Sequence, residues 1–208
     1  IKEPLILVVN DDGIDSPGIV ELADHLSSIG LVLVAAPTHQ HSGAGRSLPY
    51  TPSYSGTGII KERHLDVAHP ERVKAFAVDA TPAACIVHAL AELAGSTTPD
   101  ICVSGINFGA NLGHGLFASG TIGAAIQAAD AGIPSIAVSQ GLLPKEERPE
   151  TFEGLRQMMS TAAEITTKIA CNVLINHAQG SHLCLNVNIP AGATLETPIK
   201  QAHQASVT

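Results

Sequence analysis

Two adjacent carboxylates near the start of the chain are the first residues whose types and spacing could do chemistry. Asp11 and Asp12 follow an apolar run, residues 6–9, and precede Gly13, where the backbone can turn tightly. Neighbouring carboxylates repel one another, and a hard divalent cation such as Mg²⁺ or Mn²⁺ offsets that repulsion. The same two residues could also cap the helix that is predicted to begin at Ile19, so a metal site and an acidic helix cap both stay open.

Two later loops carry donors of a similar kind. Ser42 lies among glycines and hydroxyl side chains in residues 38–47, a composition that suits an anion or metal site but is also typical of a surface loop. Asn107 and Asn111 lie in a glycine-rich stretch that follows another apolar run. Amide carbonyls are hard oxygen ligands, and glycines let backbone amides approach a small ligand. This loop therefore offers the same chemistry as the first one.

A third polar stretch, Ser119-Gly120-Thr121, precedes a run of small residues that continues toward Asp130. Ser119 or Thr121 could cap a helix over this run, and the unpaired amides at its start would bind a phosphate group. Ordinary capping, with the small residues packed close to a sheet, would give the same pattern. The spacing alone does not separate the two interpretations.

The apolar runs between these loops predict an open α/β fold, in which ligands bind at the carboxyl ends of buried parallel strands. Strands are predicted at residues 6–9, 31–36, 74–78, 99–106, 133–138 and 182–189, with helices at residues 19–26, 83–93 and 151–175 and from the Ser-Gly-Thr stretch toward residue 130. Residues 49–72 show no clear period and predict a hairpin or an irregular excursion from the sheet. His88, inside a predicted helix, is interpreted as structural.

Size and composition predict one domain over residues 1–208, since the chain has 208 residues and 45% of them are hydrophobic. The stretch after Pro190 carries no signal that completes a domain. No apolar run approaches the ~20 residues of a membrane span and no signal sequence is evident, which predicts a cytoplasmic protein without a membrane partner. The widely spaced cysteines are expected to be reduced core residues: Cys85, Cys102, Cys171 and Cys184.

The charge balance limits the partners. A net charge of −8 with only 11 Lys and Arg argues against binding long nucleic acid through its phosphates. The absence of Trp, with two Tyr and four Phe, disfavours a base-stacking platform. A small anionic ligand would therefore take its counter-charge from a metal, helix N-termini and backbone amides.

Taken in order, the polar loops resemble one known family. The shared motifs are Asn10-Asp11-Asp12-Gly13-Ile14 with Ser16-Pro17-Gly18, then Ser42-Gly43, Thr81-Pro82-Ala83, residues 103–113 (Val-Ser-Gly-Ile-Asn-Phe-Gly-Ala-Asn-Leu-Gly), Ser119-Gly120-Thr121 and Leu185-Asn186-Val187-Asn188. Over nearly the whole chain, this set closely resembles the SurE family, the survival-protein nucleotidases. The resemblance implies a three-layer, Rossmann-like α/β fold with a mostly parallel, mixed sheet.

The same resemblance implies a divalent-metal phosphomonoesterase that acts on nucleoside monophosphates as a 5'/3'-nucleotidase and, in some members, on short polyphosphate. By motif position, one Mg²⁺ or Mn²⁺ per subunit would be held by Asp11, Asp12, Ser42 and Asn107. The phosphate of the substrate would meet Asn111, Ser119, Gly120 and Thr121. Asp11 or Asp12 could also orient or deprotonate the attacking water, and no general acid is assigned. The family further implies a homodimer or homotetramer with exchanged C-terminal segments.

Some positions depart from the family pattern. The family commonly has Tyr at the position of Ala118 and an acidic residue at that of Gly115, and it reads Gly-Thr-Pro-Ala-Asp where Ala80 and Ala84 flank this motif. The positions assigned to metal and phosphate are unchanged. The departures therefore concern pocket shape and substrate choice rather than the class of reaction.

Three alternatives accompany this interpretation. The chain could be a nucleotide-binding or regulatory module that keeps the fold without turnover, which the altered pocket favours and the retained ligand types disfavour. An NAD-dependent Rossmann enzyme is disfavoured because the first turn lacks the three-glycine fingerprint. His39 and His41 could instead bind a softer metal.

Overall fold

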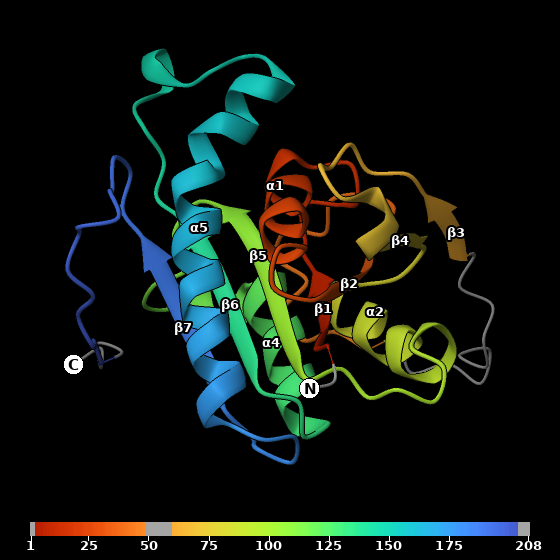
Figure 1. Ribbon diagram of the computed structural model, residues 1–208. Coiled ribbons are helices and arrows are strands. Elements are labelled where there is room, and N and C mark those ends of the chain that lie inside the picture. Colours follow the sequence, from red (N-terminus) through yellow and green to blue (C-terminus); the bar gives the residue numbers. More distant parts are fainter. Residues whose placement is uncertain (1–2, 49–59, 204–208) are drawn as a thin grey trace.

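A seven-stranded sheet forms the middle layer of the fold in the computed structural model, which describes residues 3–48 and 60–203 (Figure 1). Its strand order is β3-β4-β2-β1-β5-β6-β7. The strands are β1 (Leu5–Val9), β2 (Leu31–Pro37), β3 (Ile60–Arg63), β4 (Val73–Val78), β5 (Ile101–Phe108), β6 (Ser135–Gln140) and β7 (Cys184–Ile189). Strand β3 pairs antiparallel with β4, and the other neighbouring pairs are parallel.

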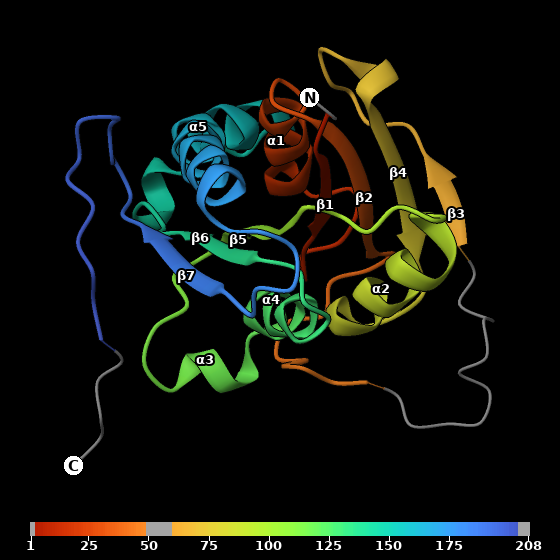
Figure 2. The same ribbon diagram turned by 60° about the horizontal axis from the view of Figure 1, so that its bottom comes forward.

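Helices cover both faces of this sheet. They are α1 (Pro17–Leu26), α2 (Pro82–His88), α3 (Gly115–Ala118), α4 (Gly120–Asp130) and α5 (Phe152–Asn176), with short turns η2 (Pro70–Arg72), η3 (Ala89–Leu93) and η4 (Lys145–Glu147). Figure 2 shows α1 and α5 together on one face and α2 and α4 on the other. Among the described residues, no helix has both the length and the apolar composition needed to cross a membrane.

The central strand β1 is buried on both faces. Ile6 and Val8 pack into the core beneath α1 and α5, whereas Leu7 and Val9 pack into the core beneath α2 and α4. Successive side chains of a strand point to opposite faces, so a strand covered on both sides must be apolar at every position. This is why the run before Asp11 is continuous rather than alternating.

The order of connections creates a crevice beside β1. The chain leaves β1 through α1 to pair with β2 on one side, and it returns to the other side of β1 only at β5. Ligands of open α/β sheets bind where the strand order reverses in this way, outside the carboxyl ends of the strands. The loops after β1, β2 and β5 meet there.

The predicted fold class is confirmed, and the differences lie at element ends. Strand β5 extends through Asn107 and Phe108, beyond the predicted end, because its pairing with β6 resumes after a register shift past Ser104. Gly105 permits this shift, since it has φ +142° and a Cβ there would lie 2.4 Å from the carbonyl oxygen of Val138. Asn107 is therefore held by the sheet rather than by a free loop.

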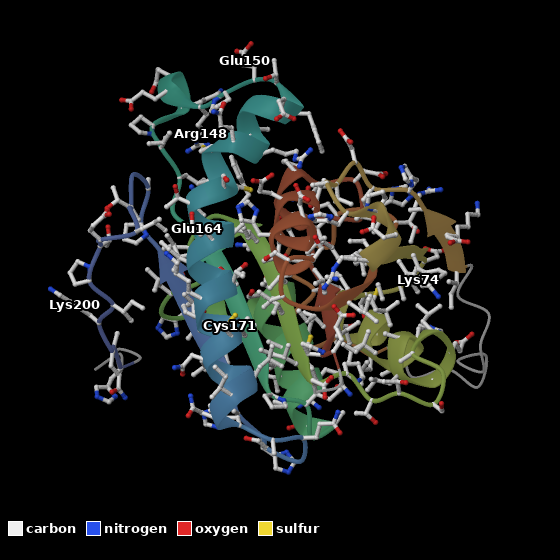
Figure 3. All side chains as sticks on the ribbon, viewed as in Figure 1. Lys74, Arg148, Glu150, Glu164, Cys171 and Lys200 are labelled. Carbon is white, nitrogen blue, oxygen red and sulfur yellow. The ribbon has the colours of Figure 1, made fainter. Side chains whose placement is uncertain are left out.

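Other differences are smaller. Strand β6 begins two residues later than predicted and ends at Gln140, the predicted helix after Thr81 becomes π-helical at Ala89, and the short helix α3 has no counterpart in the prediction. Part of the predicted hairpin becomes β3, and residues 49–59 lie outside the described residues. Cys85 and Cys102 are buried as expected, Cys171 on α5 (labelled in Figure 3) is partly buried, and Cys184 is exposed because β7 is an edge strand.

Candidate active site

A cavity of about 310 Å³ opens at the carboxyl ends of β1 and β5. The turn after β1, the loop after β2, the end of β5 and the segment before α4 all line it. The predicted site residues among its lining are Asp11, Asp12, Ser42, Asn107, Asn111 and Ser119. Gly120 and Thr121 do not line it, although they follow Ser119 directly. We call this space the acidic cavity.

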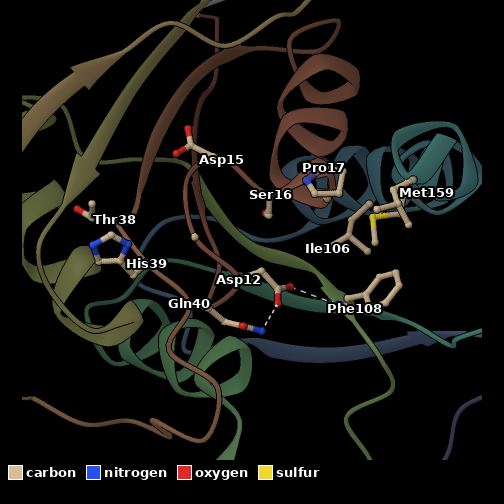
Figure 4. A pocket seen from close by; sticks show the side chains of 13 residues that line it. Asp12, Asp15, Ser16, Pro17, Thr38, His39, Gln40, Ile106, Phe108 and Met159 are labelled. Carbon is tan, nitrogen blue, oxygen red and sulfur yellow. Dashed lines mark hydrogen bonds between the residues drawn. The ribbon is translucent and has the colours of Figure 1, made fainter. Parts of the chain in front are cut away.

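Asp12 forms one wall of the acidic cavity and also lines a second cavity beside it (Figure 4). Its Oδ2 accepts a hydrogen bond from the backbone N–H of Phe108 at 3.3 Å, and its Oδ1 accepts one from Nε2 of Gln40 at 3.4 Å. Burial, together with the negative charge of Asp11, raises the pKa of Asp12 to about 6. The two hydrogen bonds are long and only partly compensate the negative charge of this carboxylate. A carboxylate in this state is suited to bind a cation.

Asp11 is held more firmly than Asp12. It is 5% exposed, and its Oδ1 accepts a hydrogen bond from Oγ1 of Thr121 at 2.7 Å. Gly120 lets the start of α4 lie against this side chain, because a Cβ at Gly120 would lie 2.7 Å from Cβ of Asp11. The hydroxyl of Thr121 is thus engaged with a carboxylate, which differs from the expected contact with substrate phosphate.

The alternative in which the aspartates cap the first helix is wrong. Helix α1 begins at Pro17 with Ser16 as its N-cap, and no acidic residue lies in its first turn. Proline suits this first position because its missing N–H would have no partner there. At α4 the capping residue is Ser119, whose Oγ accepts a hydrogen bond from the N–H of Ile122 at 3.2 Å.

Asn107 and Asn111 also line the acidic cavity. Nδ2 of Asn107 donates to the carbonyl oxygen of Gly109 at 2.6 Å, while its Oδ1 accepts no hydrogen bond from the described residues. The amide is therefore oriented so that its oxygen is the atom left for a ligand. Nδ2 of Asn111 donates to Oγ of Ser139 at 2.9 Å.

Two asparagines of β7 hold the backbone of Asn111. Oδ1 of Asn188 accepts its N–H at 2.8 Å, and Nδ2 of both Asn186 and Asn188 donates to its carbonyl oxygen, each at 3.1 Å. We call these residues the asparagine clamp. Sequence reasoning did not assign them a role, although their spacing of two places them on one face of a strand.

The histidine and glutamine side chains of the loop after β2 divide between the cavities. Gln40 lines both cavities and contacts Asp12, a role that no sequence signal indicated. His39 lines only the second cavity, and His41 lines neither. Within residues 3–48 and 60–203, no three His, Cys, Asp or Glu side chains cluster as a metal site.

Phe108 lines both cavities, and its ring lies near a cation. The guanidinium of Arg148, labelled in Figure 3 in the segment before α5, lies 5.8 Å from the ring centroid. Nε of Arg148 also donates to the carbonyl oxygen of Leu143 at 2.6 Å. The cation–π contact with Arg148 therefore helps to hold the ring of Phe108 in place.

The raised pKa of Asp12 predicts a pH-dependent stability of the metal-free protein. Between the ordinary value of 3.8 and about 6, the folded state binds more protons than the unfolded chain, so the free energy of unfolding falls as pH rises through this range. Asp12→Asn should remove this loss and stabilise the protein above pH 6 by about 1–3 kcal/mol. Urea denaturation of the parent and of the variant at pH 4 and pH 8, with a chelator present, measures these free energies of unfolding.

Asp79→Asn is the matched control for this experiment, because Asp79 is an exposed carboxylate that follows β4 at the same edge of the sheet and lines neither cavity. It should keep the pH dependence of the parent protein. Equal pH dependence in the parent and in Asp12→Asn would show that Asp12 is not the group responsible.

Comparison with known proteins places this geometry in a family. A family model described as survival protein SurE matches residues 6–208. The chain belongs to the SurE family. It is 35% identical over 195 residues to a protein of Methanocella arvoryzae named 5'-nucleotidase SurE, covering 93% of this chain and 70% of that protein. A protein of the same name from Halobacterium salinarum is 37% identical over 207 residues, covering 98% and 72%.

A solved structure agrees with this membership. The crystal structure of the SurE protein from Aquifex aeolicus superposes with a TM-score of 0.69 and 35% sequence identity. The match covers 90% of this chain and 66% of that SurE protein, so the present chain spans slightly less than two thirds of it. The resemblance inferred from the polar loops is confirmed at the level of family and fold.

Proposed function

We propose that this chain is a divalent-metal-dependent phosphomonoesterase that hydrolyses nucleoside monophosphates. The observation that carries the proposal is the acidic cavity, in which two carboxylates, an oriented asparagine oxygen and a helix start face one small space. The relatives named 5'-nucleotidase SurE support the same reaction class. Short polyphosphate is a second substrate that this site would accept by the same chemistry.

The donor set fits one hard divalent cation. Asp11 and Asp12 offer carboxylate oxygens, Asn107 offers a free amide oxygen, and the exposed hydroxyl of Ser42 faces the same cavity. Oxygen donors of this kind select Mg²⁺ or Mn²⁺ over softer metals. Bound there, the cation would neutralise phosphoryl oxygens and lower the pKa of a coordinated water.

The protein residues then divide into holding and positioning roles. Asp11 is fixed by Thr121, so its second oxygen has a defined direction, while the less restrained Asp12 orients the attacking water and accepts its proton. Asn111 and Ser119 line the acidic cavity and would contact the phosphate there, and the first amides of α4 would add a partial positive charge. No side chain around the acidic cavity is assigned as general acid.

Phosphate release from a panel of nucleoside monophosphates tests the proposal, with Mn²⁺, Mg²⁺ or chelator present in excess. We expect hydrolysis with either metal and none with chelator. A nucleotide-binding module without turnover, the second candidate, would show a metal-dependent thermal shift with nucleotide but no phosphate release. That outcome would replace the enzyme assignment by the binding one.

Base discrimination is expected to be modest. Of the two aromatic residues considered for stacking, Phe108 lines the cavities, whereas Phe117 is 77% exposed and lines neither. One stacking contact contributes about 1–3 kcal/mol, so kcat/KM should differ between bases by less than about a thousandfold. Competition assays between the four ribonucleoside monophosphates measure this ratio, and a larger preference would contradict the prediction.

We also propose that the chain forms one domain and assembles as a homodimer or homotetramer. After β7, residues 190–203 run away from the sheet without helix or strand (Figure 2), and Leu195 and Ile199 in this segment are 44% and 81% exposed. Apolar side chains on an extended segment are suited to contact a second subunit. Multi-angle light scattering at micromolar concentration should give at least twice the monomer mass. A clean monomer mass would refute this prediction.

A cytoplasmic location is proposed from cysteine chemistry. The four cysteines are all free, and two of them are fully buried, which suits a reducing compartment. The acidic net charge agrees with a small-molecule substrate rather than long nucleic acid.

A further inference from the structure

The loop that carries Asn111 contacts a row of polar side chains on β5, β6 and β7, which lie side by side in the sheet (Figure 2). Asn107, Ser139 and Asn188 are direct partners in the register of these strands, so their side chains point to the same face. Asn107 lines the acidic cavity, whereas Ser139 and Asn188 do not. The row therefore runs from the proposed metal site to the edge strand β7.

Ser139 is the member of this row that binds the side chain of Asn111. It is fully buried, and its Oγ accepts a hydrogen bond from Nδ2 of Asn111 at 2.9 Å. The backbone N–H and carbonyl oxygen of Asn111 are bonded to the asparagine clamp, so both backbone and side chain are fixed to the sheet. The atoms of the Asn111 amide without a partner among the described residues are Oδ1 and the second hydrogen of Nδ2.

The hydroxyl of Ser139 is used in one direction only. It accepts from Asn111, but its own hydrogen has no acceptor within residues 3–48 and 60–203. A buried hydroxyl hydrogen without an acceptor costs free energy, and a serine can donate as well as accept. Half a turn of the Asn111 amide about its Cβ–Cγ bond exchanges Oδ1 and Nδ2. Ser139 then donates to Oδ1, and both hydrogens of Nδ2 become available.

An anion in the acidic cavity favours this second orientation. Asn111 lines the cavity and Ser139 does not, so the atom of the amide that is not bonded to Ser139 is the one available to a ligand there. A carbonyl oxygen in that place repels a phosphate oxygen, whereas an N–H group donates to it. The methyl group of alanine in place of Ser139 would support neither orientation.

We propose that Ser139 is a positioning residue for phosphate. It accepts from Nδ2 of Asn111 in the empty site and donates to Oδ1 when phosphate binds, which presents Nδ2 to a phosphate oxygen. The inference rests on the proposed function, in which Asn111 contacts the phosphate, and adds the residue that sets the direction of this amide. Asn107, the neighbour of Ser139 on β5, is oriented by Gly109 instead, so metal binding does not depend on Ser139.

Ser139→Ala is the first test. The KM of adenosine 5'-monophosphate and the inhibition constant of inorganic phosphate should rise in parallel, by about five- to thirtyfold, because the amide loses the partner that directs it. The turnover number should change less than about threefold, since the contact is made in the ground state and the transition state alike. The dissociation constant of Mn²⁺, measured by calorimetry without substrate, should change less than about twofold.

Ser135→Ala is the matched control. Ser135 is fully buried on the same strand and lines neither cavity, and its Oγ donates to the carbonyl oxygen of Leu183 at 3.3 Å. This variant loses the same hydroxyl group from the same strand. It should leave KM and the inhibition constant of phosphate within about twofold of the parent values.

A double variant separates positioning from a general loss of structure. Asn111→Ala removes the amide on which Ser139 acts, so adding Ser139→Ala to it should raise KM less than about twofold further. The proposal is refuted if the two effects multiply, if Ser139→Ala weakens Mn²⁺ as much as phosphate, or if Ser139→Ala changes neither KM nor the inhibition constant.

The rotation itself is tested in the parent protein by NMR, with Mg²⁺ present. The side-chain NH₂ signals of Asn111 are identified by their absence in Asn111→Ala. Their nuclear Overhauser effect to the Hβ atoms of Ser139 should be present without phosphate and disappear when inorganic phosphate is added. An effect that persists at saturating phosphate contradicts the rotation.

These outcomes differ from failure of the proposed function. If the parent protein releases no phosphate from nucleotides, the phosphomonoesterase assignment fails. Calorimetric titration of the protein with inorganic phosphate, in the presence of Mg²⁺, then still tests Ser139. Binding that Ser139→Ala weakens and Ser135→Ala preserves supports the positioning role, and undetectable binding to the parent refutes it.

Discussion

Asp12→Asn is expected to lower metal-dependent phosphate release by about a hundredfold or more, equivalent to about 2.7 kcal/mol of transition-state stabilisation. The substitution keeps the shape of the side chain and removes one of the two charges that would hold the cation. The apparent affinity for Mn²⁺ should fall as well, so that high Mn²⁺ restores part of the activity. The same variant is expected to be more stable than the parent without metal above pH 6, which separates loss of function from loss of folding.

The change in affinity for Mn²⁺ is measured independently of turnover, by comparing the thermal unfolding temperature with and without Mn²⁺. A ligand that binds only the folded state adds about 2.7 kcal/mol at 100 times its dissociation constant, so weaker binding appears directly as a smaller shift. Asp79→Asn again serves as the control and should keep both the full shift and normal turnover. If Asp12→Asn also keeps both, the carboxylate pair is not a metal site and the proposed function loses its basis.

The second large effect is expected at Thr121, which is fully buried and donates to Asp11 at 2.7 Å. Thr121→Val keeps the volume but removes the donor, leaving Oδ1 of Asp11 without this partner. We expect kcat to fall roughly 10- to 100-fold and the dissociation constant of Mn²⁺ to rise roughly fivefold or more. Thr121→Ser keeps the hydroxyl and should recover most of both values.

Thr166→Val is the matched control for Thr121→Val. Thr166 is also fully buried, and its hydroxyl donates to the carbonyl oxygen of Ala162 at 2.7 Å within α5. Both variants should lose about 1 kcal/mol of stability, but only Thr121→Val should weaken Mn²⁺ binding. If Thr121→Val instead binds Mn²⁺ like the parent and raises only KM, then Thr121 acts on the phosphate, as the sequence alone had suggested.

The sheet and its polar edge could be predicted because they depend on local patterns. Continuous apolar runs identified the buried strands, and the residues directly after them had to gather at one edge. The sequence therefore predicts that Asp11, Asp12, Asn107 and Asn111 lie at the same edge of the sheet. The resemblance to the SurE family added the metal and phosphate roles of these residues, which composition and periodicity could not supply.

The contacts within the site could not be predicted, because they depend on distances between segments far apart in the chain. Nothing in the spacing of Ser119 and Thr121 indicates which hydroxyl caps α4 and which one reaches Asp11. Gln40 likewise gains its contact with Asp12 only through the packing of two loops. The end of β5 was missed because a register shift, absent from any periodic pattern, carries the strand on to Phe108.

The asparagine clamp lies on β7, the last strand to be synthesised, so the site is complete only after this strand has been made. Once the ribosome has synthesised Thr121, every proposed metal and phosphate residue is present in the chain. Asn186 and Asn188 follow roughly 65 residues later, which takes several seconds at a synthesis rate of about 5–20 residues per second. Until β7 pairs with β6, the backbone of Asn111 lacks its partners on that strand. A nascent chain, or one cut before Cys184, would carry the ligands without the strand that fixes their last loop, so activity should appear only when the edge of the sheet is complete.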